Sequence, residues 1–282
     1  MVILHLQIKF LTMYIFLRLL CFLLLMLPWC ASAQNQTEPV LFMNFNDLPA
    51  HYYVDTLLKM RQVEISEDQG IKGSRCIKVN YLGYDRGSER VVKRLPLSYP
   101  LEEATLNFAV KFEEDFQFVR GGKLHGLGPE KPVTGGDEMH PEGWSTRVMF
   151  KGFGKIISYI YHQNKPGKWG DGSGTVVPVF TPGEYNYVSL YTRVNSPASS
   201  SNGIFEIWVD GKLIIKHDSL QLRTIESKAS LINNFLFSTF HGGNNPSYAP
   251  KDSSGNYTIE IAWFDNFAVY EGKYILYNNT EK

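Results

Sequence analysis

The chain has few cysteines and almost no helical periodicity. Three cysteines occur in 282 residues, and two of them, Cys21 and Cys30, lie in an apolar leader. If the leader is removed, Cys76 remains alone and an internal disulfide is excluded, so stability must come from the hydrophobic core. Cys76 stands in an alternating run and is expected to be a small buried apolar residue. The scarcity of apolar residues at three- and four-residue spacing argues against a helical fold.

Residues 1–33 have the features of an export signal. A basic start precedes a long apolar run, and residues 31–33 read Ala-Ser-Ala, a small-x-small cleavage pattern. We predict cleavage after Ala33 and secretion of residues 34–282, outside the cell or into a periplasm, as a single domain with no membrane attachment. A retained membrane anchor is the alternative, because the apolar run is long enough for one.

Charge of neither sign dominates. The full sequence has 28 Lys and Arg against 28 Asp and Glu. Removal of the leader takes away Lys9 and Arg18 and no acid, which leaves 26 basic against 28 acidic residues and a net charge of −2. Such a chain has no global basic field. Nucleic-acid binding is therefore disfavoured, and any attraction for a polyanion must be local.

Short alternating runs rich in β-branched and aromatic residues predict an all-β fold. Clusters of Gly, Pro, Asn and Ser divide the runs, which is typical of an antiparallel sandwich or β-jelly roll of the concanavalin-like kind. The runs are residues 40–46, 76–82, 104–112, 144–150, 155–162, 185–194, 204–209, 213–217, 235–240 and 259–270. Asp210-Gly211 predicts a tight primed hairpin turn between two of them. Residues 57–71 are the one candidate for a short helix or irregular segment.

One hairpin carries the strongest candidate site. Ser145 and Arg147 are two residues apart, as are Tyr159 and Tyr161, and such residues point to the same face of a strand. A turn centred on Phe153, between two glycines, places Arg147 opposite Tyr159 and Ser145 opposite Tyr161. The four side chains then form one block, roughly 4.5–5.5 Å apart across the strands. The same pattern also suits half-buried sheet aromatics beside a surface arginine.

A second motif, GGKLHGL at residues 121–127, places Lys123 among glycines. Glycines let the backbone come close to a ligand, and lysine supplies a compact positive charge there. The motif predicts a loop at a binding site, with Gly122 and His125 in contact with substrate. A solvated lysine in a turn is the alternative.

In order and spacing, these two motifs resemble the alginate lyases of polysaccharide lyase family 14. The related glucuronan lyases have a similar core. Further likeness lies in residues 238–250, with a Gly-Gly loop, and in residues 265–270, so that the resemblance spans roughly residues 75–271. His125 stands where the family pattern usually has proline, which adds a titratable group beside Lys123.

The resemblance implies a metal-independent polysaccharide lyase with its active site in a groove on one sheet. Lys123 would have a central catalytic role, Ser145 and Arg147 would bind the substrate carboxylate, and Tyr159 and Tyr161 would move protons. The expected reaction is β-elimination on a uronic-acid polymer, alginate or glucuronan, which leaves unsaturated uronate ends. No cofactor is implied.

The identity of the base has two readings. A free tyrosine titrates near pH 10, so Lys123 could lower the pKa of Tyr159 or Tyr161 and make a tyrosinate accessible. We expect one tyrosine to serve as base and acid in this way. Lys123 as the base is the main rival.

Other residues are weaker candidates. Arg90 and Trp144 are expected to contact substrate, and residues 128–143 to border the site. Asp137, Glu138 and His140 are expected to be solvated rather than to bind a metal. The protein is expected to be a monomer. The alternative to an enzyme is a non-catalytic carbohydrate-binding jelly roll. Its stacking platforms would be Trp144, Tyr159, Tyr161 and Trp169.

Overall fold

The computed structural model describes residues 38–43, 45–46 and 52–277. The proposed export signal lies outside the described residues. From Glu38 onward the described residues belong to one compact unit. No helix among the described residues is long and apolar enough to cross a membrane.

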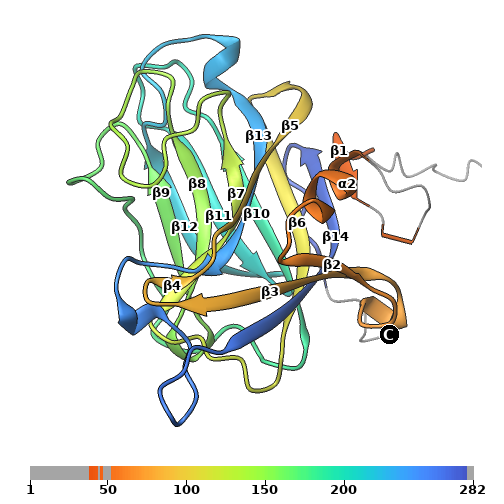
Figure 1. Cartoon of the computed structure of the whole chain (residues 1–282). Helices are drawn as coiled ribbons and strands as arrows, with labels where there is room; N and C mark the ends of the chain where they lie inside the picture. The colour runs from red at the N-terminus through yellow and green to blue at the C-terminus, as the bar shows by residue number, and fades with distance from the viewer. Residues whose placement is uncertain (1–37, 44, 47–51, 278–282) are drawn as a thin grey trace, which may run out of the picture. The chain divides into compact units, whose positions relative to one another are not determined.

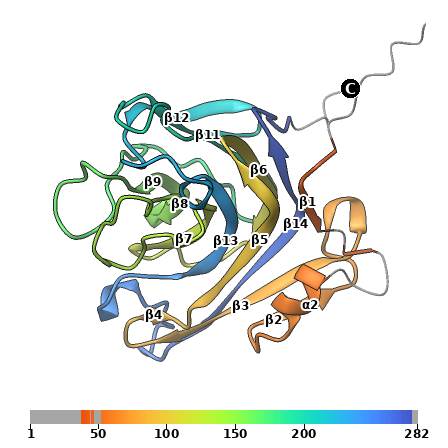
Figure 2. The same ribbon diagram turned by 90° about the horizontal axis from the view of Figure 1, so that it is seen from above.

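Two antiparallel sheets make up the fold (Figure 1). The larger has nine strands, in the order β12-β11-β10-β6-β14-β3-β2, with β1 on β14 and β4 on β3. Its strands are β1 (Leu41–Met43), β2 (Val63–Ser66), β3 (Cys76–Tyr84), β4 (Gly87–Ser88), β6 (Glu103–Phe112), β10 (Tyr185–Arg193), β11 (Gly203–Val209), β12 (Lys212–Leu220) and β14 (Ile259–Glu271). Figure 2 shows this sheet curving around the smaller one.

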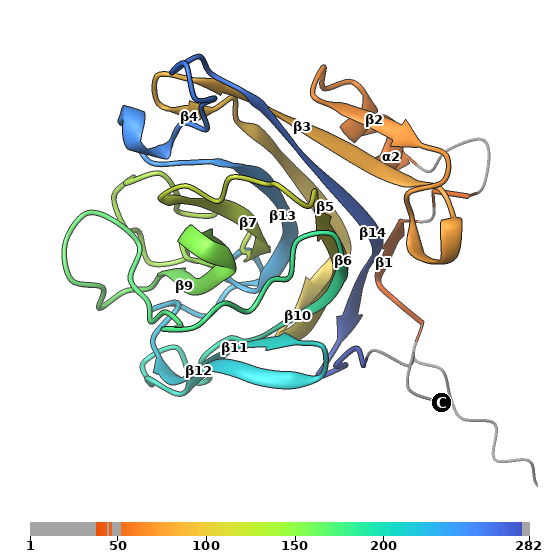
Figure 3. The same ribbon diagram turned by 90° about the horizontal axis from the view of Figure 1, so that it is seen from below.

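The smaller sheet has five strands in the order β5-β13-β7-β8-β9. They are β5 (Val91–Leu101), β7 (Gly121–Gly128), β8 (Ser145–Lys151), β9 (Lys155–Tyr161) and β13 (Ile232–His241). Within the described part of the chain, the α-helix α2 (Tyr52–Leu58) lies beside β2 and β3 (Figure 3). Short 3₁₀ turns occupy η1 (Ile71–Gly73), η2 (Gly152–Gly154), η3 (Lys228–Ser230) and η4 (Pro246–Tyr248).

The core lies between the two sheets and is rich in phenylalanine. Phe108 and Phe112 from β6, Phe150 from β8 and Phe237 from β13 belong to one buried cluster, and all four are fully buried. Each such side chain contributes roughly 1.5–3 kcal/mol by leaving water. Because alternate residues of a strand point to opposite faces, the other face of β8 and its neighbours points away from the core. That second face is called the outer face below.

The predicted all-β antiparallel sandwich is confirmed. Each of the ten predicted strand runs contains or overlaps a strand, and Cys76 is buried as expected. Asp210 and Gly211, with φ of 50° and 76°, form the predicted turn between β11 and β12.

One expectation about secondary structure holds in part and another is wrong. Residues 57–71 contain the end of α2 and are otherwise mostly turns and bends, as predicted, but they also include the short strand β2. The motif at residues 121–127 is not a loop but most of β7, the central strand of the five-stranded sheet. Its glycines permit close packing between strands rather than a turn: a Cβ on Gly126 would lie 2.0 Å from the carbonyl oxygen of Thr146.

Candidate active site

The hairpin of β8 and β9 has the register that the sequence predicts. Ser145 pairs with Tyr161 and Arg147 with Tyr159. The turn at η2 is left-handed at Phe153, with φ of 64°, and at the following glycine. Glycine accommodates this conformation without strain, which explains why a three-residue turn can close here.

Strand β7 brings Lys123 to the same face. Lys123 pairs with Met149 of β8, and a bulge separates this pair from the next, Gly126 with Arg147. Paired residues of antiparallel strands share a face, so Lys123, Met149 and Arg147 all point outward. The site therefore assembles on three adjacent strands.

Lys123 lies over the ring of Tyr159. Its Nζ atom is 3.3 Å from the ring centroid and 2.9 Å from the Sδ atom of Met149. Burial lowers the pKa of Lys123 well below its ordinary value, and the positive charges of Arg147, Lys151 and Arg90 lower it further. A lysine of this kind can hold a neutral amine and act as a base.

Arg147 is a buried cation without a partner of opposite charge. Only 6% of the residue is exposed, and its Nε and Nη2 atoms have no hydrogen-bond partner among the described residues. Its Cζ atom lies 5.4 Å from the ring centroid of Tyr159. A buried unpaired charge is costly, so this guanidinium is suited to receive a carboxylate from a ligand.

Tyr159 and Tyr161 form a pair of hydroxyls. Their Oη atoms are 3.4 Å apart, and the backbone N–H of Gly136 donates to Tyr161 Oη at 2.8 Å. Tyr161 is fully buried whereas Tyr159 is partly exposed. Burial, aided by the neighbouring Tyr159 hydroxyl, raises the pKa of Tyr161. Tyr161 is therefore held in its neutral form.

Residues 128–143 border this cluster, as expected. Besides the contact of Gly136 with Tyr161, the Ser145 hydroxyl donates to the carbonyl oxygen of Val133 at 2.8 Å. Ser145 is fully buried. The structure therefore gives its hydroxyl an internal partner, and the expected contact with a substrate carboxylate is not supported.

Burial and packing argue against three of the predicted substrate contacts, those of His125, Trp144 and Gly122. His125 is fully buried, and its ring lies 4.5 Å from that of Phe237 in the core. The β7 bulge after Lys123 breaks the alternation and turns His125 inward. Trp144 is also fully buried and donates its indole N–H to the carbonyl oxygen of Ser230. A Cβ on Gly122 would point into the ring of Phe150.

Arg90, which the sequence suggested as a substrate contact, lies close to the cluster. Its Cζ atom is 5.7 Å from the centroid of Phe240, which pairs with Lys123 across β7 and β13. Trp169 is 57% exposed, and a Cβ on Gly136 would lie 2.7 Å from its ring. Trp169 therefore stands beside the loop that contacts Tyr161.

Sequence reasoning missed Met149 and Lys151. Both lie on β8 in the alternation that identified Ser145 and Arg147, so continuing that pattern by two and four residues would have found them. Met149 contacts Lys123, and the charge of Lys151 lowers the pKa of Lys123.

The five-stranded sheet is strongly basic. None of its five fully described strands contains Asp or Glu. On its outer face the basic residues are Arg94, Lys123, Arg147, Lys151 and Lys155, whereas Lys93 pairs with the buried Phe237 and starts from the core-facing side. A chain without a global basic field thus concentrates positive charge on one sheet, which favours an anionic ligand there.

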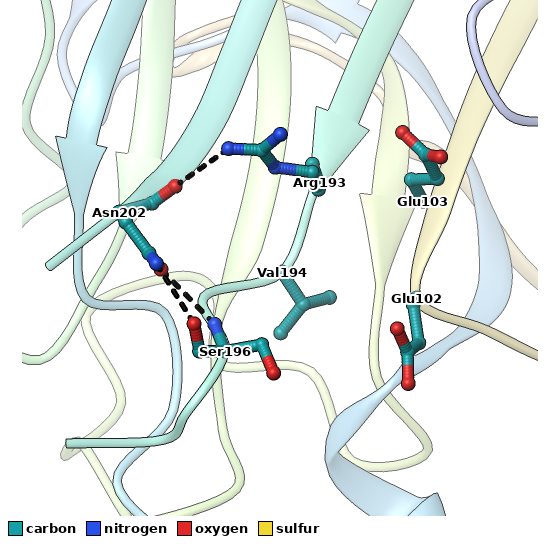
Figure 4. Close-up of a pocket in the computed structure, with 6 residues that line it drawn as sticks. All are labelled: Glu102, Glu103, Arg193, Val194, Ser196 and Asn202. Atoms are coloured by element: carbon teal, nitrogen blue, oxygen red, sulfur yellow. Dashed lines mark hydrogen bonds between the residues drawn. The ribbon is translucent and has the colours of Figure 1, made fainter. Parts of the chain in front are cut away.

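One cavity is separate from this cluster. It has a volume of about 350 Å³ and shares no residue with the Lys123 cluster (Figure 4). Its lining residues are Glu102, Glu103, Arg193, Val194, Ser196 and Asn202. Among the described residues, no group of three or more His, Cys, Asp or Glu could hold a metal ion.

Comparison with solved structures shows the same fold in several lyases. Alginate lyase Aly36B, as a double mutant in complex with an alginate tetrasaccharide, superposes with a TM-score of 0.65 at 21% identity, covering 83% of this chain and 97% of that chain. The PL-14 alginate lyase from Aplysia kurodai has a TM-score of 0.62 at 19% identity, covering 83% of this chain and 100% of that chain. The endo-β-1,4-glucuronan lyase from Trichoderma reesei has a TM-score of 0.57 at 18% identity, covering 83% and 96%.

Comparison with sequences gives the family. No curated protein sequence matches the chain. The family model described as polysaccharide lyase 14 matches residues 86–261, which is well over half of the chain and includes the whole Lys123 cluster. The chain therefore belongs to polysaccharide lyase family 14 and is a polysaccharide lyase.

Proposed function

We propose that this lyase cleaves alginate by β-elimination, with protein side chains alone supplying the catalytic groups. The observation that carries the proposal is the contact of Lys123 with Tyr159 beside the unpaired guanidinium of Arg147. A base, a hydroxyl donor and a carboxylate-binding cation are the three groups that the elimination requires.

The bond changes assign a task to each group. A base removes the proton from C5 of the uronate, next to the carboxylate. The C5–H electron pair forms the C4=C5 double bond while the C4–O4 bond breaks, and an acid protonates the departing O4. Negative charge accumulates on the carboxylate during this step. The Arg147 guanidinium, which has no partner inside the protein, is suited to stabilise that charge.

The pKa directions favour Lys123 as the base. Burial and three neighbouring cations lower the pKa of Lys123, which increases its neutral fraction. The pKa of Tyr161 is raised, which opposes formation of a tyrosinate. We therefore prefer the lysine over a tyrosine base, in contrast to the first choice drawn from the sequence.

Tyr159 is the better candidate for the acid. Tyr161 accepts the N–H of Gly136, and its own proton can be donated to Tyr159 Oη. The proton of Tyr159 is then left for O4 of the substrate. Tyr159 is also the more exposed of the two tyrosines. Tyr161 would act through Tyr159 as a positioning residue.

The choice of alginate rests on the solved relatives. Aly36B was solved in complex with alginate oligosaccharides, and the Aplysia kurodai protein is an alginate lyase. Glucuronan is the second candidate, because the Trichoderma reesei neighbour is a glucuronan lyase of the same fold. Both polymers are anionic, and the five-stranded sheet, which contains basic residues but no Asp or Glu, would attract either of them.

Export remains part of the proposal. Residues 1–33 have the composition and the Ala-Ser-Ala site of a signal peptide, and extracellular polymers are reached only by an exported enzyme. Determination of the N-terminal residue of the mature protein tests this: Gln34 is expected, and an intact leader would contradict it.

A substrate panel tests the activity. Residues 34–282 are incubated with alginate, polymannuronate, polyguluronate and glucuronan, and the ultraviolet absorbance of the unsaturated uronate is followed. Mass analysis should show products with an unsaturated non-reducing end. A chelator is expected to leave the rate unchanged. Products that all carry an added water would instead indicate hydrolysis and overturn the elimination.

A further inference from the structure

Three arginines lack a polar partner, and all three lie at one face. Of the nine arginines in the described residues, six make an ion pair or hydrogen bond within the protein. These six are Arg61, Arg75, Arg86, Arg120, Arg193 and Arg223. Within the same described residues, the guanidinium groups of Arg90, Arg94 and Arg147 have none.

Arg94 and Arg147 lie in one row across the five-stranded sheet. Arg147 on β8 pairs with Gly126 on β7, Gly126 with Leu236 on β13, and Leu236 with Arg94 on the edge strand β5. Residues paired in this way share a face, so both arginines point outward from the core. Figure 2 shows β5, β13, β7 and β8 side by side in this order.

The two residues between the arginines in this row are uncharged and apolar. Gly126 has no side chain, and Leu236 is only 5% exposed. Three interstrand steps separate Arg147 from Arg94, which corresponds to roughly 14–15 Å. This separation exceeds the length of one sugar ring, so a ligand that contacts both must be a chain.

Arg90 lies on the same side of the molecule. Its contact with Phe240 places it near the end of the row that contains Lys123, and its charge is close enough to lower the pKa of Lys123. Arg94 is exposed and contributes no such effect. The unpaired arginines therefore extend from the catalytic centre toward the edge strand β5.

We propose that Arg94 forms a distal subsite for the carboxylate of a uronate unit several rings from the cleaved bond, with Arg90 at the same edge of the sheet, near the end of the row that contains Lys123. This inference rests on the proposed cleavage of a uronan. A planar guanidinium binds a carboxylate through two parallel hydrogen bonds, and no acid in the five strands competes for it. The subsite would make the enzyme prefer polymer over short oligomers.

A charged residue on an edge strand can instead serve to prevent edge-to-edge association. That role and the subsite have different consequences. Loss of an edge charge would promote association of the protein without altering its preference for long chains. Loss of the subsite would alter the preference in a protein that stays dispersed.

The test compares Arg94→Gln with Lys93→Gln. Lys93 is the next residue of β5 but pairs with the buried Phe237, so its side chain starts from the opposite face. Both changes remove one positive charge from the same strand. We measure kcat/KM on the polymer and on the shortest oligomer that the wild type cleaves.

For Arg94→Gln, the ratio of kcat/KM on polymer to that on the shortest oligomer should fall roughly two- to fivefold, as for loss of an exposed ion pair. Lys93→Gln should retain the wild-type ratio. An unchanged ratio in Arg94→Gln, or an equal fall in Lys93→Gln, overturns the subsite.

If the wild type cleaves no uronan, the proposed function fails but the subsite can still be tested. The test is then the binding of each variant to alginate and to glucuronan, measured as retention in affinity electrophoresis. Arg94→Gln should be retained less than Lys93→Gln. Equal retention of the two variants overturns the subsite.

Discussion

The Nζ atom of Lys123 lies 3.3 Å from the centroid of the Tyr159 ring. The ring carries no net charge, so it fixes the position of the amine without supplying a counter-charge. The nearest charged groups that act on Lys123 are all cations: Arg147, Lys151 and Arg90. This combination holds an amine in place while disfavouring its protonation, which is what a lysine base needs.

Replacement of Lys123 should abolish turnover without unfolding the protein. Removal of a general base costs about 10²- to 10⁴-fold in rate. Lys123→Ala removes the amine. Lys123→Arg keeps a positive charge but introduces a guanidinium that stays protonated in proteins. We expect both variants to lose kcat by this factor, measured by the absorbance of unsaturated product.

Circular dichroism and retention by the polymer serve as controls for these two variants. Both should keep the β-sheet spectrum, and Lys123→Arg should still bind alginate. Wild-type turnover in either variant would remove Lys123 from the mechanism.

The pH dependence should reveal the lowered pKa of Lys123. The neutral amine is the active form, so kcat/KM should rise with pH as Lys123 loses its proton. Because burial and cations lower this pKa, the rise should occur well below the ordinary lysine pKa, near 10.4. Lys151→Gln removes one of those cations. The pKa of Lys123 should then increase, and the rising limb should move to higher pH.

Lys93→Gln is the control for this shift, because Lys93 starts from the opposite face of the sheet and does not act on Lys123. Its pH profile should match that of the wild type. A limb that stays in place in Lys151→Gln, or that moves to lower pH, would contradict the assignment of the limb to Lys123.

The hairpin of the site could be predicted from sequence because two local signals agreed. The two-residue spacing of Ser145 and Arg147, and of Tyr159 and Tyr161, sets the face, while the glycines around Phe153 set the turn. Together they determine which residues lie opposite one another. Both signals are local, so no knowledge of tertiary contacts was needed.

The central strand could not be predicted in the same way. Glycine is equally suited to a loop and to a strand that packs closely against its neighbours, and only the neighbours distinguish the two. Strand β7 also contains a bulge between Lys123 and Gly126, which turns His125 into the core. Strand β5 was not among the predicted runs. Its Pro96 would disfavour a central strand, but β5 is an edge strand, which tolerates proline.

The two tyrosines should differ in importance. Tyr159→Phe keeps the ring under Lys123 and removes only the proposed proton donor, so kcat should fall by about 10²- to 10⁴-fold. Tyr161→Phe removes a hydroxyl that acts through Tyr159, and its loss in kcat should be smaller. Both values come from initial rates on alginate at saturating substrate.

The KM values of the two variants provide the second readout. Since neither hydroxyl neutralises the carboxylate, KM should change less than kcat in both. If Tyr161→Phe loses more activity than Tyr159→Phe, the roles of the acid and the positioning residue are reversed.

Gly122 should prove essential for packing rather than for substrate contact. A Cβ at this position would lie 2.1 Å from the Cζ atom of Phe150 and 2.3 Å from the carbonyl oxygen of Phe240. Overpacking of this kind costs about 1–3 kcal/mol. We expect Gly122→Ala to lower the free energy of unfolding by that amount, measured by denaturant titration.

A double-mutant cycle with Phe150→Leu separates the clash from other effects. Phe150→Leu alone opens a space in the core and should destabilise the wild type. In the Gly122→Ala background that space relieves the clash, so the same change should cost less there, and the coupling between the two positions should be favourable. Strictly additive losses would mean that the added methyl does not press on Phe150, and that the role of Gly122 must be sought in the backbone of β7.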